Sequence, residues 1–143
     1  MFDLPIGSVM DKKKMLTAPP ETTVSEAAEL MANRNAGAVM VVEKGLLVGI
    51  FTERDAVFRV IAKGLDARTT HLTEVMTKSP QTVDPDKPFG FALLMMYENG
   101  FRHVPVIQNG KPVGIVSARN ALDPDLDEFK YEVSRRKHIR DLR

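Results

Sequence analysis

The sequence has no cysteine, no long apolar run and almost no net charge. Without cysteine, disulfide bonds and thiolate metal sites are excluded, which fits a reducing compartment. No apolar run approaches the roughly 18 residues that span a bilayer. The first residues lack a basic stretch followed by an apolar one, so we expect a cytoplasmic protein that does not enter the membrane. A formal net charge of +1 gives no global electrostatic case for binding nucleic acid or anionic lipid.

Motifs of common enzymes are also missing. There is no Gly-x-x-x-x-Gly-Lys-[Ser/Thr] loop, no Gly-x-Ser-x-Gly elbow and no His-Glu-x-x-His sequence. His71 and His138 are isolated and give no metal-ligand spacing. The sequence therefore predicts a protein that is not an enzyme, holds no metal and requires no cofactor.

What the sequence does contain is an internal repeat. Gly49–Ala56 reads glycine, two apolar residues, a hydroxyl residue, any residue, Arg, Asp, Ala, and Gly114–Ala121 repeats this with Asn for Asp. The offset of 65 positions continues upstream, where Val39, Val41, Gly45, Thr17 and Pro20 match Val104, Val106, Gly110, Thr82 and Pro85. A repeat of this length indicates two copies of one structural unit.

Residues 6–64 form the first repeat, in which we expect strand, helix, strand, strand and helix. The elements expected after its first strand are a helix capped by Thr23 and Glu26, strands at 38–42 and 46–51 around a tight turn, and a helix at about 53–63 capped by Thr52.

A linker at 65–71 leads into the second repeat, residues 72–122, whose Leu72–Met76 echoes Ile6–Met10. The elements expected here are a helix between Pro88 and Gly100, and strands at 103–107 and 112–116 joined by Asn109-Gly110, a strong hairpin signal. Residues 123–143 are expected to form a last helix, with Asp123 as N-cap and Pro124 at its first position. Acids early and bases late in this segment complement the helix dipole.

The repeat, with its ending Gly-h-h-[Ser/Thr]-x-x-[Asp/Asn] (h, apolar), resembles the CBS domain, and two in tandem resemble a Bateman module. The resemblance covers residues 6 to about 122 and implies an α/β (α+β) fold of two β-α-β-β-α repeats about a pseudo-twofold axis, followed by the C-terminal helix. It also implies two clefts that can hold adenine nucleotides, no catalytic activity, and a homodimer that senses a ligand on behalf of an unknown effector protein.

The motif residues suit a sugar phosphate. A carboxylate such as Asp55 can accept from both ribose hydroxyls, whereas Asn120 has one acceptor oxygen and no charge. Thr52 and Ser117 stand at helix starts, where free backbone N–H groups favour phosphate. The family resemblance assigns the same roles. The alternative is that all four residues are ordinary N-caps.

Arg102 and His103, just before Val104-Pro105-Val106, are a second signal. The resemblance places such a basic pair near the centre of the module, within reach of phosphate, and the first repeat has Gly37-Ala38 there instead. A surface salt bridge and a satisfied, partly buried histidine are the alternative.

The remaining candidate residues have less specific predicted roles. Arg54 and Arg119 could add phosphate contacts or simply face solvent. The resemblance places Thr17-Ala18 and Thr82-Val83 along the adenine slot through their backbone groups. The full predicted set is Thr17, Ala18, Thr52, Arg54, Asp55, Thr82, Val83, Arg102, His103, Pro105, Ser117, Arg119 and Asn120.

Two functions remain open. The first is an asymmetric sensor in which one cleft dominates, with AMP, ADP, ATP or S-adenosylmethionine as regulatory ligand. The second is a structural or dimerisation module without a small ligand, whose basic run Arg135–His138 contacts a partner protein or nucleic acid. The balance of acids and bases in residues 123–143 favours a solvated helix over that contact.

Overall fold

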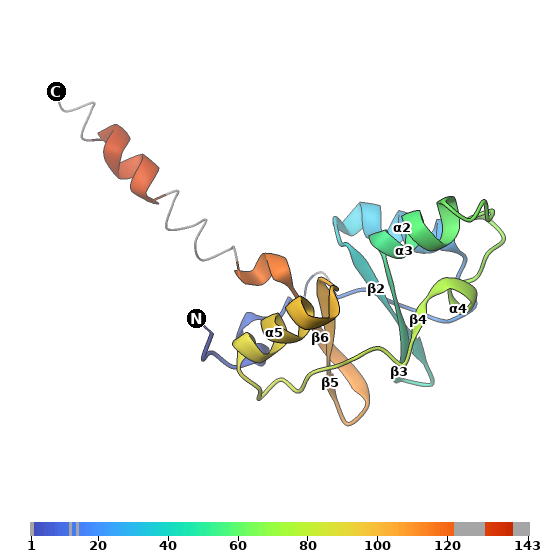
Figure 1. Cartoon of the computed structure of the whole chain (residues 1–143), viewed down its shortest axis with the longest axis horizontal. Coiled ribbons are helices and arrows are strands. Elements are labelled where there is room, and N and C mark those ends of the chain that lie inside the picture. Colours follow the sequence, from blue (N-terminus) through green and yellow to red (C-terminus); the bar gives the residue numbers. More distant parts are fainter. Residues whose placement is uncertain (1, 12, 14, 122–130, 139–143) are drawn as a thin grey trace.

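The computed structural model describes residues 2–11, 13, 15–121 and 131–138, and shows two halves, each with a small sheet (Figure 1). The first half contains β1 (Thr17–Ala18), α2 (Val24–Arg34), β2 (Ala38–Glu43), β3 (Leu46–Thr52), α3 (Glu53–Asp55) and the π-helix η1 (Ala56–Ile61). The second contains α5 (Phe89–Asn99), β5 (His103–Gln108), β6 (Lys111–Ser117) and the 3-10 helix η2 (Ala118–Ala121). Short elements start each repeat, namely α1 (Ile6–Val9) in the first, and α4 (Leu72–Val75) and β4 (Thr77–Lys78) in the second.

Both predicted hairpins are confirmed. Lys44 and Gly45 have φ values of 53° and 79°, and Asn109 and Gly110 have 56° and 77°. Positive φ at both central residues is the type I′ turn, whose twist matches that of the flanking strands. The hairpins therefore form from local turn chemistry, and their strands extend at most one residue beyond the predicted ends.

The helix predictions hold with two differences, one of which is that the element after β6 is the 3-10 helix η2 over its described residues. α2 begins after Thr23, whose Oγ1 accepts from the Glu26 N–H, and α5 ends at Gly100 in the left-handed conformation. The predicted helix at 53–63 is present, but only its first turn is α-helical, because residues 56–61 adopt π-helical bonding. Apolar spacing over so few residues does not separate the two helix types.

The two sheets differ in extent but share a plan. The first has the order β1-β2-β3-β4, with β1 parallel to β2 and the other pairs antiparallel. In the second, β5 and β6 are flanked by single bridges, Val83 to Val106 and Asp11 to Ile115, at the places of β1 and β4. Ala38, Ile50 and Ile115 form a small apolar cluster where the sheets meet. The predicted fold of two facing repeats is confirmed.

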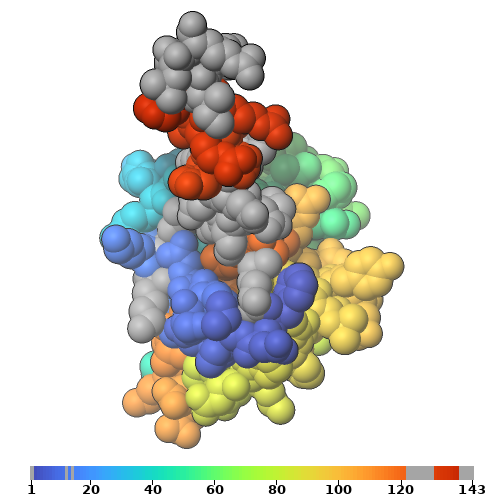
Figure 2. Space-filling view, turned by 90° about the vertical axis from the view of Figure 1, so that its left-hand side faces the viewer, coloured from blue at the N-terminus to red at the C-terminus, as the bar shows by residue number. Residues whose placement is uncertain are grey.

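The segment that starts each half is packed into the other half. Ile6 is fully buried with Phe89 and Val104 of the second core, and its N–H donates to the Lys87 carbonyl at 2.8 Å. Leu72 is buried in the first core, and its N–H donates to the Thr22 carbonyl at 2.8 Å. In Figure 1 the two connecting segments cross between the halves, and in Figure 2 the blue N-terminal residues lie against the yellow-green segment before α5. The halves are therefore interlocked.

This exchange explains the glycine that opens each motif. A Cβ on Gly49 would collide with the Met76 side chain, and one on Gly114 with that of Met10. Both methionines come from the exchanged segments. The motif glycine thus leaves the space that the methionine side chain occupies.

The C-terminal helix is present over residues 131–138, and in Figure 1 it lies apart from the two sheets. The predicted helix start at Asp123 and Pro124 lies outside the described residues.

Candidate functional site

A pocket of about 950 Å³ lies between the halves. This inter-repeat pocket has one wall from the first half, which includes residues 36–38 and Glu53, and one from the second half, which includes Arg102, His103 and residues 117–120. Its volume falls in the range typical of small-molecule sites. Five of the predicted ligand-binding residues line it: Arg102, His103, Ser117, Arg119 and Asn120.

The second motif forms the polar corner of this pocket. β6 ends at Ser117 and the chain turns into η2, so Ser117 and Asn120 face each other across one turn. The Ser117 N–H donates to Asn120 Oδ1 at 2.7 Å, and the Ser117 hydroxyl lies 3.4 Å from the same oxygen. Both side chains are half-buried. The cap interaction fixes their positions at the pocket wall.

His103 begins β5 opposite Ser117, beside the exposed side chains of Arg102 and Arg119. Burial lowers the pKa of His103 below its usual 6.5, and the positive charges of Arg119 and Arg102 lower it further. The carboxylate of Glu53, from the other half, acts in the opposite direction. The imidazole is therefore neutral near pH 7, and an anion bound beside it would favour protonation.

The first motif is arranged differently. Thr52 and Asp55 form a reciprocal cap, in which the Thr52 N–H donates to Asp55 Oδ2 at 2.9 Å and Thr52 Oγ1 accepts from the Asp55 N–H at 3.3 Å. Asp55 is only 8% exposed, and its Oδ1 lies 3.4 Å from Nε of Arg59. Neither Thr52 nor Asp55 lines the inter-repeat pocket. Both motifs thus make the N-cap interactions of the simpler alternative, and of the two caps only Ser117–Asn120 lines this pocket.

Arg59 is a residue that the sequence reasoning missed. Its Nη1 donates to the carbonyls of Val75 and Met76, each at 3.2 Å. It therefore ties the helix after the first motif to the first residues of the second repeat. The sequence signal that could have identified Arg59 is its position four residues after Asp55 on a predicted helix, a spacing that allows an ion pair.

Glu53 was also missed, because it occupies the variable position of the motif. Arg54, by contrast, was predicted to bind ligand, yet its guanidinium lies 5.0 Å from the centre of the Phe58 ring on the exposed face of the helix. Arg54 is not among the residues that line the inter-repeat pocket. Its contact with Phe58 is a cation–π interaction.

The sequence matches the CBS domain family twice, over residues 6–62 and 72–125. The chain belongs to the CBS domain family. The CBS domain-containing protein CBSCBSPB5 of Arabidopsis thaliana is 36% identical over 88% of this chain, and the match covers 23% of that protein. YhcV of Bacillus subtilis, also a CBS domain-containing protein, is 36% identical over 73% of this chain and 74% of its own length. This chain thus spans under a quarter of the Arabidopsis relative.

Solved structures place the fold among CBS domain pairs. An uncharacterized conserved protein from Pyrococcus horikoshii has a TM-score of 0.80 and 32% identity, covering 87% of this chain and 94% of that one. The CBS domain protein PAE2072 from Pyrobaculum aerophilum, solved with AMP, has a TM-score of 0.74 and 25% identity over 82% of this chain and 89% of that one. The CBS domain pair of MJ0100, with 5′-methylthioadenosine and S-adenosyl-L-methionine bound, has a TM-score of 0.73 and 25% identity over 82% and 95%. CBS domains are generally regulatory rather than catalytic.

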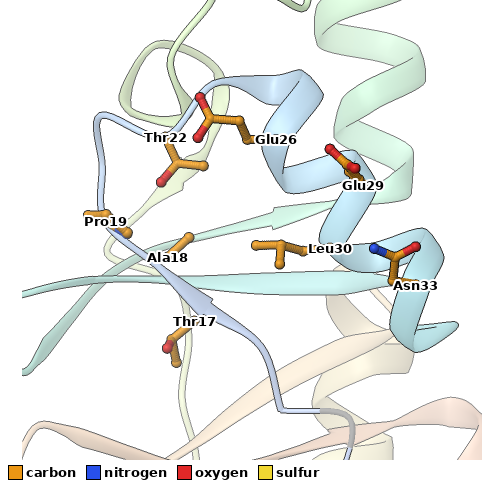
Figure 3. Close-up of a pocket in the computed structure, with 8 residues that line it drawn as sticks. All are labelled: Thr17, Ala18, Pro19, Thr22, Glu26, Glu29, Leu30 and Asn33. Atoms are coloured by element: carbon orange, nitrogen blue, oxygen red, sulfur yellow. The ribbon is translucent and has the colours of Figure 1, made fainter.

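In this CBS pair, the predicted adenine-slot residues of the first repeat lie in a second, smaller pocket of about 400 Å³. Figure 3 shows Thr17 and Ala18 on β1, with Glu26, Glu29 and Leu30 on the neighbouring α2. In the second repeat, Val83 and Pro105 are buried, and the Val83 N–H donates to the Pro105 carbonyl at 3.0 Å. Neither of these, nor Thr82, lines the inter-repeat pocket.

The C-terminal basic run is exposed. Arg135 lies 3.7 Å from Glu132, and the run from Arg135 to His138 has no buried member. Contact with a partner protein or nucleic acid stays a prediction. Among the described residues, no group of His, Cys, Asp and Glu is arranged to hold a metal ion, and no helix is long and apolar enough to span a bilayer.

Proposed function

We propose that this CBS pair is a non-catalytic regulatory module that binds an adenosine-containing ligand in the inter-repeat pocket. The observation that carries the proposal is the convergence of Arg102, His103, Ser117 and Asn120 on one pocket with a wall from each repeat. The complexes of PAE2072 with AMP and of MJ0100 with S-adenosyl-L-methionine support the choice of ligand class.

Each pocket side chain has a role in this proposal. Arg102 offers a fork of donors to a phosphate, and neutral His103 can gain a proton beside it. Asn120 offers an amide to the ribose, next to the hydroxyl of Ser117. Asp55, which lies outside this pocket, is a candidate ribose acceptor for a separate, weaker site, because a carboxylate has more acceptor positions than Thr52 and Arg59 occupy. The two motifs are unequal, which supports one dominant site.

Binding between two interlocked halves gives a route to regulation. A ligand that contacts both walls favours arrangements in which the walls are correctly spaced, and only such differential affinity can shift an equilibrium. Arg59, on η1, holds the start of the second repeat through the Val75 and Met76 carbonyls, so a change in the spacing of the repeats would alter this contact. A separate effector protein would read that change.

Calorimetric titration tests the ligand. We expect saturable heat with at least one of AMP, ADP, ATP and S-adenosylmethionine at micromolar to millimolar concentration. Asn120→Ala should weaken this binding about threefold to tenfold, because one neutral hydrogen bond contributes about 0.5–1.5 kcal/mol. Asn33→Ala, on the smaller pocket of Figure 3, is the matched control and should bind normally. No heat with any of these ligands at millimolar concentration would sink the proposal.

We further propose that the module self-associates. Val57, Phe58 and Ile61 of η1 are 50%, 57% and 71% exposed, which is a large apolar area for one short helix. One structural relative is a hexameric CBS-CP12 protein from bloom-forming cyanobacteria. Sedimentation velocity should show a dimer, and a species of 15.9 kDa alone at micromolar concentration would contradict this.

A further inference from the structure

Glu53 presents a carboxylate from the first repeat to the basic wall of the second. Its backbone N–H donates to the Gly37 carbonyl at 3.0 Å, which anchors it at the pocket. A Cβ placed on Gly37 would lie 3.2 Å from Glu53 Oε1 and 3.1 Å from His103 Nε2. Because Gly37 has no side chain, the carboxylate of Glu53 and the imidazole of His103 have room to approach each other across the pocket.

Charges of both signs lie around this pocket. Among the described residues that line it, Arg102 and Arg119 are positive and Glu53 and Asp11 are negative. The lowered pKa of His103 keeps the imidazole neutral near pH 7. A site with two arginines and no carboxylate would attract a chain of phosphates, whereas this one holds a carboxylate beside the groups that would bind them.

The carboxylate affects ligands unequally. One phosphate can contact Arg102 or Arg119 and be compensated there. Each further phosphate adds negative charge that faces Glu53, and like charges a few ångströms apart repel by about 1–4 kcal/mol, depending on exposure. A 5′ substituent without phosphate, or with a positive charge, does not meet this repulsion.

We propose that Glu53 is a specificity-determining residue of the inter-repeat pocket, which selects adenosine ligands whose 5′ substituent carries at most one phosphate and rejects polyphosphates. This inference rests on the proposed function. The equivalent position of the second motif is Ala118, which also lines the pocket, so the selecting charge comes from one repeat only.

The test is a comparison of AMP and ATP in calorimetry without divalent cations. The unmodified chain should bind AMP at least about tenfold more tightly than ATP. Glu53→Gln should narrow this ratio by about fivefold or more, mainly by strengthening ATP binding, and Glu53→Asp should retain most of the discrimination. Raising the salt concentration should narrow the ratio in the unmodified chain, because the repulsion is screened.

Glu43→Gln is the matched control, since Glu43 is an exposed carboxylate at the hairpin end of β2, outside the pocket lining. It should leave the ratio unchanged. An unmodified chain that prefers ATP, or a ratio that Glu53→Gln does not move, would overturn the role of Glu53 while leaving adenosine binding intact. If neither nucleotide nor S-adenosylmethionine binds, the proposed function fails, and the selectivity fails with it.

Discussion

Alanine in place of Ile6 is expected to lower the free energy of unfolding by about 2–5 kcal/mol, the usual cost of removing a large aliphatic side chain from a close-packed core. Ile6 begins the first repeat, yet it is fully buried among Phe89, Val104 and Val106 of the second core. The loss comes from apolar area and from the cavity left behind. Urea denaturation measures it directly.

The control is Leu4→Ala, two residues earlier. Leu4 is 47% exposed, so the same kind of truncation there should cost far less. Hydrogen exchange locates the effect, because Ile6→Ala should reduce protection of β5 and β6 more than that of β2 and β3. Equal small effects of the two substitutions, or a loss of protection confined to the first sheet, would contradict the exchange of segments.

Arg102→Ala is expected to weaken AMP binding about tenfold to hundredfold, because a hydrogen bond to a charged group contributes about 1.5–3 kcal/mol. Arg102 lines the inter-repeat pocket next to His103, and its exposed side chain is free of core packing. The fold should therefore be unaffected. Calorimetry with AMP measures the change.

Two comparisons make this result specific. Arg68→Ala removes an exposed arginine from the linker, outside the pocket, and should leave AMP binding unchanged. Binding of 5′-methylthioadenosine, which has no phosphate, should be nearly insensitive to Arg102→Ala. If both ligands weaken equally, Arg102 does not contact the phosphate.

Local chemistry made most of the fold predictable. The turns at Lys44-Gly45 and Asn109-Gly110 specify their hairpins because their residues adopt positive φ readily. The exchange of Ile6 and Leu72 between cores was not predictable in this way. The echo between the two segments showed that they are equivalent, but the choice of core is decided by tertiary packing.

The candidate site was predictable in part. The motif and the basic pair named Arg102, His103, Ser117 and Asn120, which the structure brings together. The repeat symmetry predicted one cleft for each motif, and Asp55, beside Arg59, lies outside the pocket that Asn120 lines. A repeat pattern shows which positions of the two copies correspond. The pocket, however, is formed by contacts between the repeats, and these contacts depend on the residues that differ between the copies.

Glu53 shows the same limit. Within the motif it is a variable position on the first helical turn, where a carboxylate is ordinarily explained by the helix dipole. Only the packing of Gly37 against His103 reveals that it faces the other repeat. Comparing the two copies shows that Glu53 stands where the second motif has Ala118. It does not show that the Glu53 side chain faces the other repeat.

The most direct test of the account is a crystal structure of the chain grown with saturating AMP. The account predicts an adenosine moiety between residues 36–38 and the Ser117–Asn120 corner, with its phosphate beside Arg102 and His103. AMP bound instead in the smaller pocket beside Thr17 and Ala18, or an inter-repeat pocket left empty at millimolar AMP, would contradict it.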